Sequence, residues 1–452
     1  MKSINSTEIR IPSNLGILLR KAVLSSKRRE PIVFALVSHT YLYHKVVLLV
    51  RKIIQLPDEA YFPTSEHGTK WYGSAMLPIL NKALEENLGI VLFHSHPYPG
   101  LVGLSTDDRK SAMELLSVFQ NLIPLRPHAS VVFGQDHSAG LVLMPDDDNL
   151  KKNVKIRWLG KTNIDFLEEE SNSSYQVVDD IFHRQTLLIG RKGESKLKQA
   201  KVAVVGLCGG GSHVVQQLAH MGVGEIIGID SERVDRTNRS RLVGMFWWDA
   251  LLKKRKTDVM ARMVWLINPR VKFIKVSDPI PNQRAIDAFK EADVAVGCLD
   301  NLQARADLQE LAWRYLIPYV DIGLRIRPGQ NKKEVLIGGN VTTLIPGEFC
   351  LWCTGFLSEE KLLNERGGRP RSYFQGTDKQ AQVVSFNGVL ASQAVNEVLQ
   401  LLTGFLPPDK DMSMKKFNGL EGTLEKWTVN KKTDCLKCQS VLAAGDVIWR
   451  KV

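Results

Sequence analysis

Short apolar runs alternate with stretches of helical spacing through the middle of the chain. Residues 202–205 and 225–229 are apolar runs of strand length, and the segment between them has helical spacing. Two further apolar runs cover residues 293–299 and 319–323, with a helical segment expected between them. Strands that alternate with helices are typical of a doubly wound sheet in an α/β protein.

The first 150 residues combine the same two patterns in another order. Helical spacing occupies residues 12–25, 70–86 and 105–119. β-rich apolar runs occupy residues 31–38, 45–53, 88–93, 129–133 and 140–144. Because strands and helices are interleaved, we expect a separate domain of mixed α/β type here.

A polar segment at residues 168–174 predicts a linker between the two domains. We expect an N-terminal domain over residues 1–155, a linker over 156–176 and a C-terminal domain over 177–452. Residues 154–167 have the pattern of a strand that could pack on either domain.

A glycine-rich turn joins the first two apolar runs of the C-terminal domain. Gly206, Gly209 and Gly211 follow the first run, and Asp230 closes the second. Glycines let the backbone approach a phosphate, and the N-terminus of the next helix offers free N–H groups. An acid at the end of the second strand suits a ribose hydroxyl. The pattern predicts a nucleotide site, although a dinucleotide dehydrogenase or a purely steric turn would also fit it.

A further set of polar residues favours an adenylating enzyme over a dehydrogenase. Asn238 and Arg241 stand three positions apart, Lys256 follows, and Asp300 ends the third apolar run. Cations stabilise a triphosphate, and a carboxylate can hold Mg²⁺ beside it. Asp300 could instead cap the helix expected from residue 302.

These residues resemble the motifs of the adenylation domain of ThiF, MoeB and the ubiquitin-activating enzymes. The resemblance covers about residue 177 to the C-terminus and implies ATP and Mg²⁺ as ligands. The positions that match the family's nucleotide site are Gly206, Gly209, Gly211, Asp230, Glu232, Asn238, Arg241, Lys256 and Asp300. Arg184 resembles the family arginine that reaches the ATP of a partner protomer, so the resemblance implies a homodimer. Two positions depart from the family pattern, Cys208 in the turn and Leu242 after the arginine.

Four of the six cysteines form two C-x-x-C pairs. The pairs are Cys350 with Cys353 and Cys435 with Cys438. Two such pairs predict a tetrahedral zinc site, and four thiolates leave no open position, so the zinc would be structural. Redox dithiols are the alternative.

A second metal site is predicted in the N-terminal domain. His94 and His96 follow a strand, where positions i and i+2 share a face, and Asp108 could supply a third ligand. Such a set leaves one position for water, as in catalytic zinc sites. A helix cap formed by Ser105 and Asp108, with ordinary loop histidines, is the alternative.

The same residues resemble the JAMM metalloprotease signature. The resemblance implies that His94, His96 and Asp108 hold zinc and that Ser105 stabilises the oxyanion. It also implies that Glu30 exchanges a proton with the zinc-bound water, with Glu59 and Glu66 as alternatives. The loop before Ser105 is one residue longer than usual, which leaves Asp107 as an alternative ligand.

Composition adds few constraints. The chain has 452 residues, 44% hydrophobic and 24% charged, as in an ordinary globular protein of two or three domains. No apolar run reaches membrane-spanning length and no signal-peptide pattern is present, so we expect a cytoplasmic protein without membrane contact. The net charge of +12 suits ATP and an acidic protein partner. Nucleic acid is not expected, because no nucleic-acid-reading motif is found.

Together the two resemblances imply a bifunctional enzyme of a ubiquitin-like protein pathway. A zinc peptidase would trim or deconjugate the C-terminal tail, and the second domain would adenylate its terminal glycine. The alternatives are activation of a sulfur-carrier protein for cofactor or metabolite synthesis and a non-catalytic binding scaffold. Residues 359–380 predict a crossing loop without cysteine. The acyl group would therefore pass to a conjugating enzyme, a sulfur donor or, less favourably, a hydroxyl such as that of Ser372 or Thr377.

Overall fold

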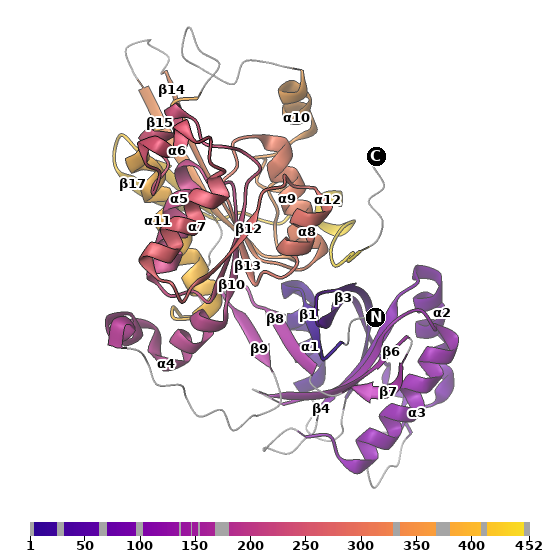
Figure 1. Cartoon of the computed structure of the whole chain (residues 1–452). Coiled ribbons are helices and arrows are strands. Elements are labelled where there is room, and N and C mark those ends of the chain that lie inside the picture. Colours follow the sequence, from indigo (N-terminus) through magenta and orange to yellow (C-terminus); the bar gives the residue numbers. More distant parts are fainter. Residues whose placement is uncertain are drawn as a thin grey trace.

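Two β-sheets organise the chain, one in each half, as the computed structural model shows (Figure 1). The structure describes residues 4–24, 31–62, 70–95, 103–134, 137–145, 147–151, 154–167, 180–328, 335–367, 380–407 and 414–446. Among these residues, no helix combines the length and the apolar character needed to cross a membrane.

The N-terminal sheet has nine strands in the order β7-β6-β5-β4-β2-β3-β1-β8-β9. The strands are β1 (Ser6–Ile11), β2 (Ile32–Tyr41), β3 (Lys45–Gln55), β4 (Gly89–Ser95), β5 (His128–Phe133), β6 (Ser138–Met144), β7 (Asp147–Lys151), β8 (Val154–Leu159) and β9 (Ile164–Leu167). The helices are α1 (Ser13–Leu24), α2 (Leu77–Glu86) and α3 (Thr106–Leu122), with short 3-10 turns η1 (Asp58–Ala60) and η2 (Gly73–Met76).

Both faces of the N-terminal sheet are covered, which explains why β2 is apolar at nearly every position. Val33 and Ala35 pack in a cluster with residues of α1. Phe34 and Leu36 point to the other face and pack with residues of α2 and α3. Successive side chains of a strand face opposite ways, so one strand serves two cores.

The C-terminal sheet has eight strands in the order β12-β11-β10-β13-β14-β15-β16-β17. The strands are β10 (Lys201–Val205), β11 (Glu225–Ile229), β12 (Lys272–Val276), β13 (Val294–Gly297), β14 (Tyr319–Pro328), β15 (Val335–Leu344), β16 (Met414–Asn418) and β17 (Thr423–Trp427). Strands β10 to β14 pair in parallel and β14 to β17 pair antiparallel. The α/β class and the Rossmann-like character predicted for this half are confirmed, and the sheet is mixed because three antiparallel strands extend it.

Helices flank the C-terminal sheet (Figure 1). They are η3 (Asp180–Phe182), α4 (His183–Gln199), α5 (Gly209–His220), η4 (Arg236–Ser240), α6 (Trp247–Leu251), α7 (Lys256–Ile267), α8 (Gln283–Phe289), α9 (Leu302–Arg314), α10 (Glu359–Arg366), α11 (Val384–Thr403) and α12 (Leu436–Gln439). The expected crossing loop 359–380 begins with helix α10. The side chain of Ser358 caps the N-terminus of this helix by accepting a hydrogen bond from the backbone N–H of Lys361. Ser372 and Thr377 lie outside the described residues.

The expected linker 156–176 needs a correction at its start. Strands β8 and β9 occupy residues 154–167, and β8 pairs in parallel with β1. This segment therefore belongs to the N-terminal sheet, because its alternating apolar side chains complete that sheet's edge.

A buried group of charged residues joins the two halves; we call it the interdomain cluster. It consists of Glu8, Arg10, Lys45, Arg157 and Asp293. The Glu8 carboxylate forms ion pairs with the side-chain nitrogens of Arg10 at 2.7 Å, Lys45 at 2.5 Å and Arg157 at 2.8 Å. Arg10 also donates to two backbone carbonyls of the C-terminal half, at 2.8 and 3.2 Å, and Arg157 pairs with Asp293. The cluster therefore ties the N-terminal sheet to the base of the C-terminal sheet.

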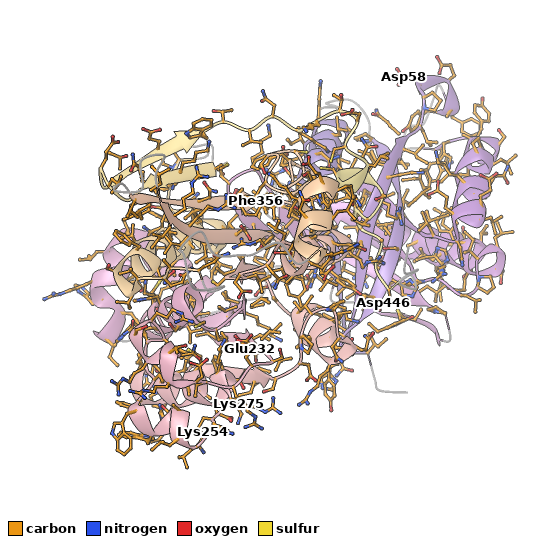
Figure 2. All side chains as sticks on the ribbon, turned by 90° about the horizontal axis from the view of Figure 1, so that it is seen from above. Asp58, Glu232, Lys254, Lys275, Phe356 and Asp446 are labelled. Atoms are coloured by element: carbon orange, nitrogen blue, oxygen red, sulfur yellow. The ribbon has the colours of Figure 1, made fainter. Side chains whose placement is uncertain are left out.

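The segment before the C-terminus adds a second tie between the halves. Thr40 of β2 donates to the carboxylate of Asp446 at 2.6 Å, and Tyr315 of the C-terminal half donates to the same carboxylate at 2.9 Å. Asp446 lies where the two halves meet (Figure 2). The halves are thus held together by polar contacts from segments far apart in the sequence.

Candidate functional site

A cleft of about 1410 Å³ lies at the carboxyl ends of β10 and β13. The strand order reverses between these two strands, which is where ligands bind in open parallel sheets. The predicted residues that line it are Gly206, Gly209, Asp230, Glu232, Arg241, Lys256 and Asp300. Gly211, Asn238 and Arg184 are not among the lining residues.

Some glycines of the turn are required by the backbone geometry, and others face the cleft. Gly206 has a φ of +88°, in the left-handed region that favours glycine. A Cβ on Gly211 would lie 1.8 Å from the carbonyl oxygen of Gly206. Gly211 is therefore needed for the tight turn, whereas Gly209, at the start of α5, faces the cleft.

Asp230 holds this turn in place from the end of β11. Its carboxylate accepts bonds from the backbone N–H of Leu207 and of Glu232, both at 2.8 Å. Burial raises the pKa of Asp230, and the opposing charge of Lys256 lowers it less. The acid expected to bind ribose therefore also shapes the phosphate turn.

Lys256 begins helix α7 and is buried in the cleft wall. Its ammonium lies 3.6 Å from Asp230 and forms an ion pair with Glu232. Burial tends to lower the pKa of Lys256, but the charge of Asp230 and the bond to Glu232 leave it raised. Glu232 is largely exposed, so this cation can exchange its surface partner for an anionic ligand. Glu232 and the exposed Lys254 lie in the same part of the C-terminal half (Figure 2).

Asn238 lies within the 3-10 turn η4 (Arg236–Ser240), and Arg241 follows directly after it. Asn238 is buried, and its side-chain oxygen accepts from the backbone N–H of Asp235 at 3.1 Å. Arg241 donates to the carbonyl of Thr237 at 3.0 Å and reaches the cleft. Asn238 thus supports the turn, and Arg241 is the member that faces the cleft.

Asp300 follows β13 and is exposed to the cleft. The cap of helix α9 is its neighbour Asn301, which accepts from the backbone N–H of Ala304 at 2.7 Å. The helix does not need the Asp300 carboxylate, so this group is available to a cation.

The cleft includes residues that the sequence analysis missed. They come from β14 to β16 and from α11, and include Arg325, Gly338, Asn387, Leu390 and Lys416. The antiparallel strands extend the cleft away from the glycine turn as an open groove. These residues stand far from the nucleotide motifs in the chain, and no local pattern marks them.

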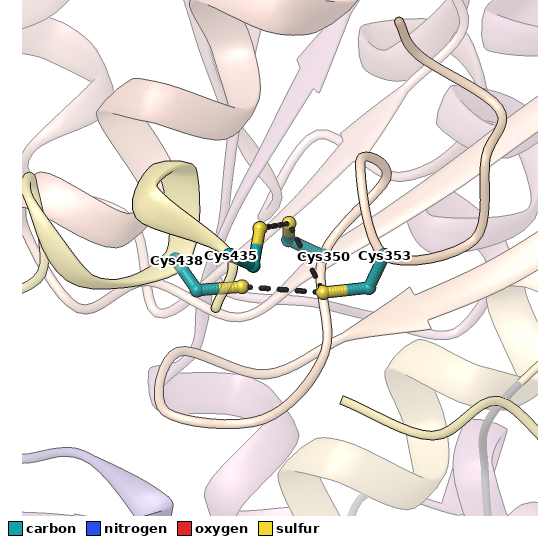
Figure 3. Close-up of side chains that lie close together, drawn as sticks. All are labelled: Cys350, Cys353, Cys435 and Cys438. Carbon is teal, nitrogen blue, oxygen red and sulfur yellow. Dashed lines mark hydrogen bonds between the residues drawn. The ribbon is translucent and has the colours of Figure 1, made fainter. Parts of the chain in front are cut away.

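The four paired cysteines come together, as predicted (Figure 3). Their sulfur atoms all lie within 4.8 Å of one another, with neighbours 3.4 to 3.8 Å apart. Zn–S bonds of about 2.3 Å at tetrahedral angles require sulfurs about 3.8 Å apart. The residues fit a structural zinc ion, which would fasten the segment around α12 to the turn after β15.

The predicted N-terminal metal site is described only in part. His94, at the end of β4, lies 3.4 Å from the carboxylate of Asp108. Ser105 caps α3, donates to Asp108 at 2.6 Å and accepts from its backbone N–H. Burial opposes ionisation of Asp108, but the bonds from His94 and Ser105 lower its pKa overall. His96, Glu30 and the alternative Glu66 lie outside the described residues.

Comparisons with known proteins bear on the C-terminal half. Residues 182–437 match the ThiF family. This match starts after the N-terminal sheet and gives the JAMM resemblance of that half no support.

Three relatives illustrate the range of similar proteins. A tRNA threonylcarbamoyladenosine dehydratase of Haemophilus influenzae is 32% identical over 130 residues, 28% of this chain and 49% of that protein. Ubiquitin-like modifier-activating enzyme 5 of Aedes aegypti is 23% identical over 255 residues, 53% of this chain and 60% of that protein. The sulfur carrier protein ThiS adenylyltransferase of Escherichia coli K12 is 23% identical over 261 residues, 57% of this chain and 94% of that protein. The chain spans about half the length of the first relative and 60% of the second.

Proposed function

The chain belongs to the ThiF family, and from this we propose that it adenylates the C-terminal carboxylate of a small carrier protein. The observation that carries the proposal is the single cleft shared by the glycine turn, Arg241, Lys256 and Asp300. These groups come from four separate elements, yet all line one cleft of about 1410 Å³, which has room for a nucleotide.

The reaction joins a carrier carboxylate oxygen to the α-phosphorus of ATP and breaks the bond between the α- and β-phosphates, releasing pyrophosphate. Arg241 and Lys256 would stabilise the negative charge that grows on the phosphate oxygens. Asp300 would hold Mg²⁺, which neutralises charge on the leaving pyrophosphate. The turn from Gly206 to Gly209 would cradle phosphate with backbone N–H groups.

The groove along β14 to β16 suits an extended peptide tail. A Cβ on Gly338 would meet only one atom, 3.7 Å away, so the floor of the groove is open there. Two relatives are named for carriers of this kind, a ubiquitin-like modifier and the sulfur carrier ThiS. We place a sulfur-carrier protein first and a ubiquitin-like modifier second, because no cysteine stands in residues 359–380 and an external sulfur donor needs none.

ATP–pyrophosphate exchange tests this function. The full chain is incubated with Mg²⁺, ATP, labelled pyrophosphate and either a ThiS-type or a ubiquitin-like protein ending in glycine. We expect exchange with one carrier, loss of exchange when its last glycine is deleted, and at least a 100-fold loss in Asp300→Asn. Mass spectrometry should find the carrier adenylate. A protein that supports no exchange with either carrier, and binds no ATP, would be the scaffold instead.

We propose that the active unit is a homodimer. Arg184 is exposed and does not line the cleft of its own chain. Exposed apolar residues surround it on η3 and α4, with Ile181 74%, Leu187 76% and Leu188 64% exposed. Such a face is typical of a protein interface.

Mixing inactive variants tests the dimer. Arg184→Ala and Lys256→Met should each be inactive alone. A mixed dimer of the two should regain activity, because one cleft then has its own Lys256 and the partner's intact arginine. No recovery in the mixture would show that Arg184 does not act across an interface.

We propose a zinc peptidase as a second candidate function, in the N-terminal half. The distance of 3.4 Å between His94 and Asp108, with Ser105 beside them, favours it. His96 and Glu30 would complete the site by resemblance alone. Metal analysis should find two zinc ions per chain, one of them lost in His94→Ala, together with cleavage of a carrier extended beyond its glycine. One zinc ion per chain in both proteins would contradict this proposal.

A further inference from the structure

Asn387 is a buried polar side chain that the proposed reaction has not used. It lies in the first turns of α11 and is 5% exposed. Among the described residues, its side-chain Nδ2 has no hydrogen-bond partner. A buried donor without a partner costs about 1 to 3 kcal/mol, so a position that keeps one needs a reason.

The amide of Asn387 lies directly over the glycine turn. A Cβ on Gly209 would lie 2.6 Å from Nδ2, so the amide occupies the space that a side chain at Gly209 would take. Asn387 also lines the same cleft as Lys256 and Asp300. Asn387 therefore lies between the glycine turn and the cleft in which the phosphates are expected.

Two helix N-termini meet at this point. Helices α5 and α11 both begin without a side-chain cap, and they pack together through Gln217 and Ser392, 3.1 Å apart. Free N–H groups at a helix N-terminus favour an anion. The unpaired amide adds a third donor to the same corner of the cleft.

The groove for the carrier tail starts beside Asn387. Leu390, one turn further along α11, packs against Gly339 of β15 and lines the cleft. Asn387 thus stands where the phosphate turn and the groove meet, which is where the carboxylate and the α-phosphate would react.

We infer that Asn387 donates a hydrogen bond from Nδ2 to an oxygen of the α-phosphate of the bound nucleotide. The inference rests on the proposed function. A bond to a charged oxygen is stronger than one between neutral groups. The phosphate oxygen of the nucleotide would be the hydrogen-bond acceptor for Nδ2, which explains why this donor has no partner among the described residues.

Two substitutions of similar size test the inference by calorimetric titration of the full chain with Mg²⁺-ATP. Asn387→Leu removes the donor, and we expect ATP to bind about 10- to 100-fold more weakly. Asn387→Asp adds a negative charge beside the phosphate, and we expect weaker binding still. Because Nδ2 has no partner to lose, the melting temperature of Asn387→Leu should equal or exceed that of the wild type. Asn396→Leu, an exposed position on the same helix, should bind ATP like the wild type.

The outcomes separate the two proposals. If the wild type binds no ATP, the proposed function fails and this inference falls with it. If the wild type binds ATP and Asn387→Leu binds it equally well, only the inference is wrong. If Asn387→Asp binds more tightly than Asn387→Leu, the side chain faces a donor rather than a phosphate oxygen. A lower melting temperature in Asn387→Leu, with unchanged affinity at low temperature, would show a purely structural role.

Discussion

Two groups of charged residues in this protein differ in how their charges are paired. The interdomain cluster is buried, and each of its charged side chains has a partner of opposite charge within the protein. The second group, Asp230, Glu232, Arg241, Lys256 and Asp300, lines the cleft and keeps charge facing open space.

The difference lies in whether each charged side chain has a partner of opposite charge within the protein. Burial tends to raise the pKa of Glu8, yet the charges of Arg157, Arg10 and Lys45 hold it well below its usual value. Glu8 therefore stays ionised, and its cations have fixed partners. In the cleft, Asp300 is exposed and not needed as a helix cap. A buried group in which every charged side chain has an ion-pair partner indicates a structural role, and a group with charged side chains left outside any ion pair indicates a ligand site.

Removing Glu8 should give the largest effect in this comparison. Glu8→Gln keeps the shape but leaves Arg10 and Arg157 buried without their shared acid. We expect the free energy of unfolding to fall by about 3 to 5 kcal/mol, with the adenylation rate per folded molecule unchanged. Urea denaturation followed by fluorescence measures this. A loss below about 1 kcal/mol would mean that water or rearrangement replaces the acid.

For Arg241, in the cleft group, we expect a loss of activity with stability unchanged. Arg241→Met should lower ATP–pyrophosphate exchange by about 100- to 1000-fold, or about 2.7 to 4 kcal/mol of transition-state stabilisation. The side chain is half-exposed and, among the described residues, donates to a single backbone carbonyl, so we expect almost no change in melting temperature. Full exchange activity in this variant would remove Arg241 from the site.

A buried histidine whose partners lie within the protein allows a test through the pH dependence of stability. His128 accepts from the backbone N–H of Ile90 at 3.1 Å and lies 3.2 Å from the carbonyl of Ile123. Burial lowers the pKa of His128 to about 4, although the bond to Ile123 opposes this. An unfolded histidine has a pKa of about 6.5, so between these pH values only the unfolded chain binds the proton.

The free energy of unfolding should therefore fall as the pH is lowered through this window. We expect His128 to account for a loss of about 2 kcal/mol between pH 7 and pH 5. Asn is an uncharged replacement, so the curve of His128→Asn should be flatter by that amount. Denaturation curves at several pH values measure the difference, and parallel curves for the two proteins would contradict the prediction.

The smallest effect is expected at a surface ion pair. Lys52 pairs with Glu86 on the N-terminal half, but their side chains are 41% and 32% exposed. Water already solvates both groups, so Lys52→Met should change the free energy of unfolding by less than about 1 kcal/mol. The same urea experiment as for Glu8→Gln measures it. A loss as large as that of Glu8→Gln would show that burial is not what separates the two pairs.

Much of the C-terminal half follows from local pattern. The expected strands at 202–205 and 225–229 correspond to β10 and β11, and the run ending before Asp300 contains β13. Strands β15 to β17 were missed because they are antiparallel and partly exposed, and every residue of β17 is exposed. A strand without a buried face has no apolar period to detect.

The candidate site was likewise predictable where its residues stand in local motifs. Glycines, paired cysteines and the strand-end acids Asp230 and Asp300 stand in short motifs, so spacing marks them as candidates, and the family resemblance chose among the alternatives. Spacing did not separate Gly211 and Asn238, which support the site, from Gly209 and Arg241, which face it. That distinction depends on which atoms of other elements lie opposite.

The sequence by itself determined the α/β class of the protein, its glycine turn and its two C-x-x-C pairs, because these depend on backbone sterics and residue spacing over short range. The tertiary structure alone brought the two cysteine pairs together across 85 positions and decided which charged side chains are paired within the protein. Glu8 and Asp293 meet across 285 positions of the chain, and Gly209 and Asn387 across 178, through the contacts of Arg157 and of the turn itself. Packing brings such residues together, and only packing shows whether a buried polar atom has found a partner within the protein.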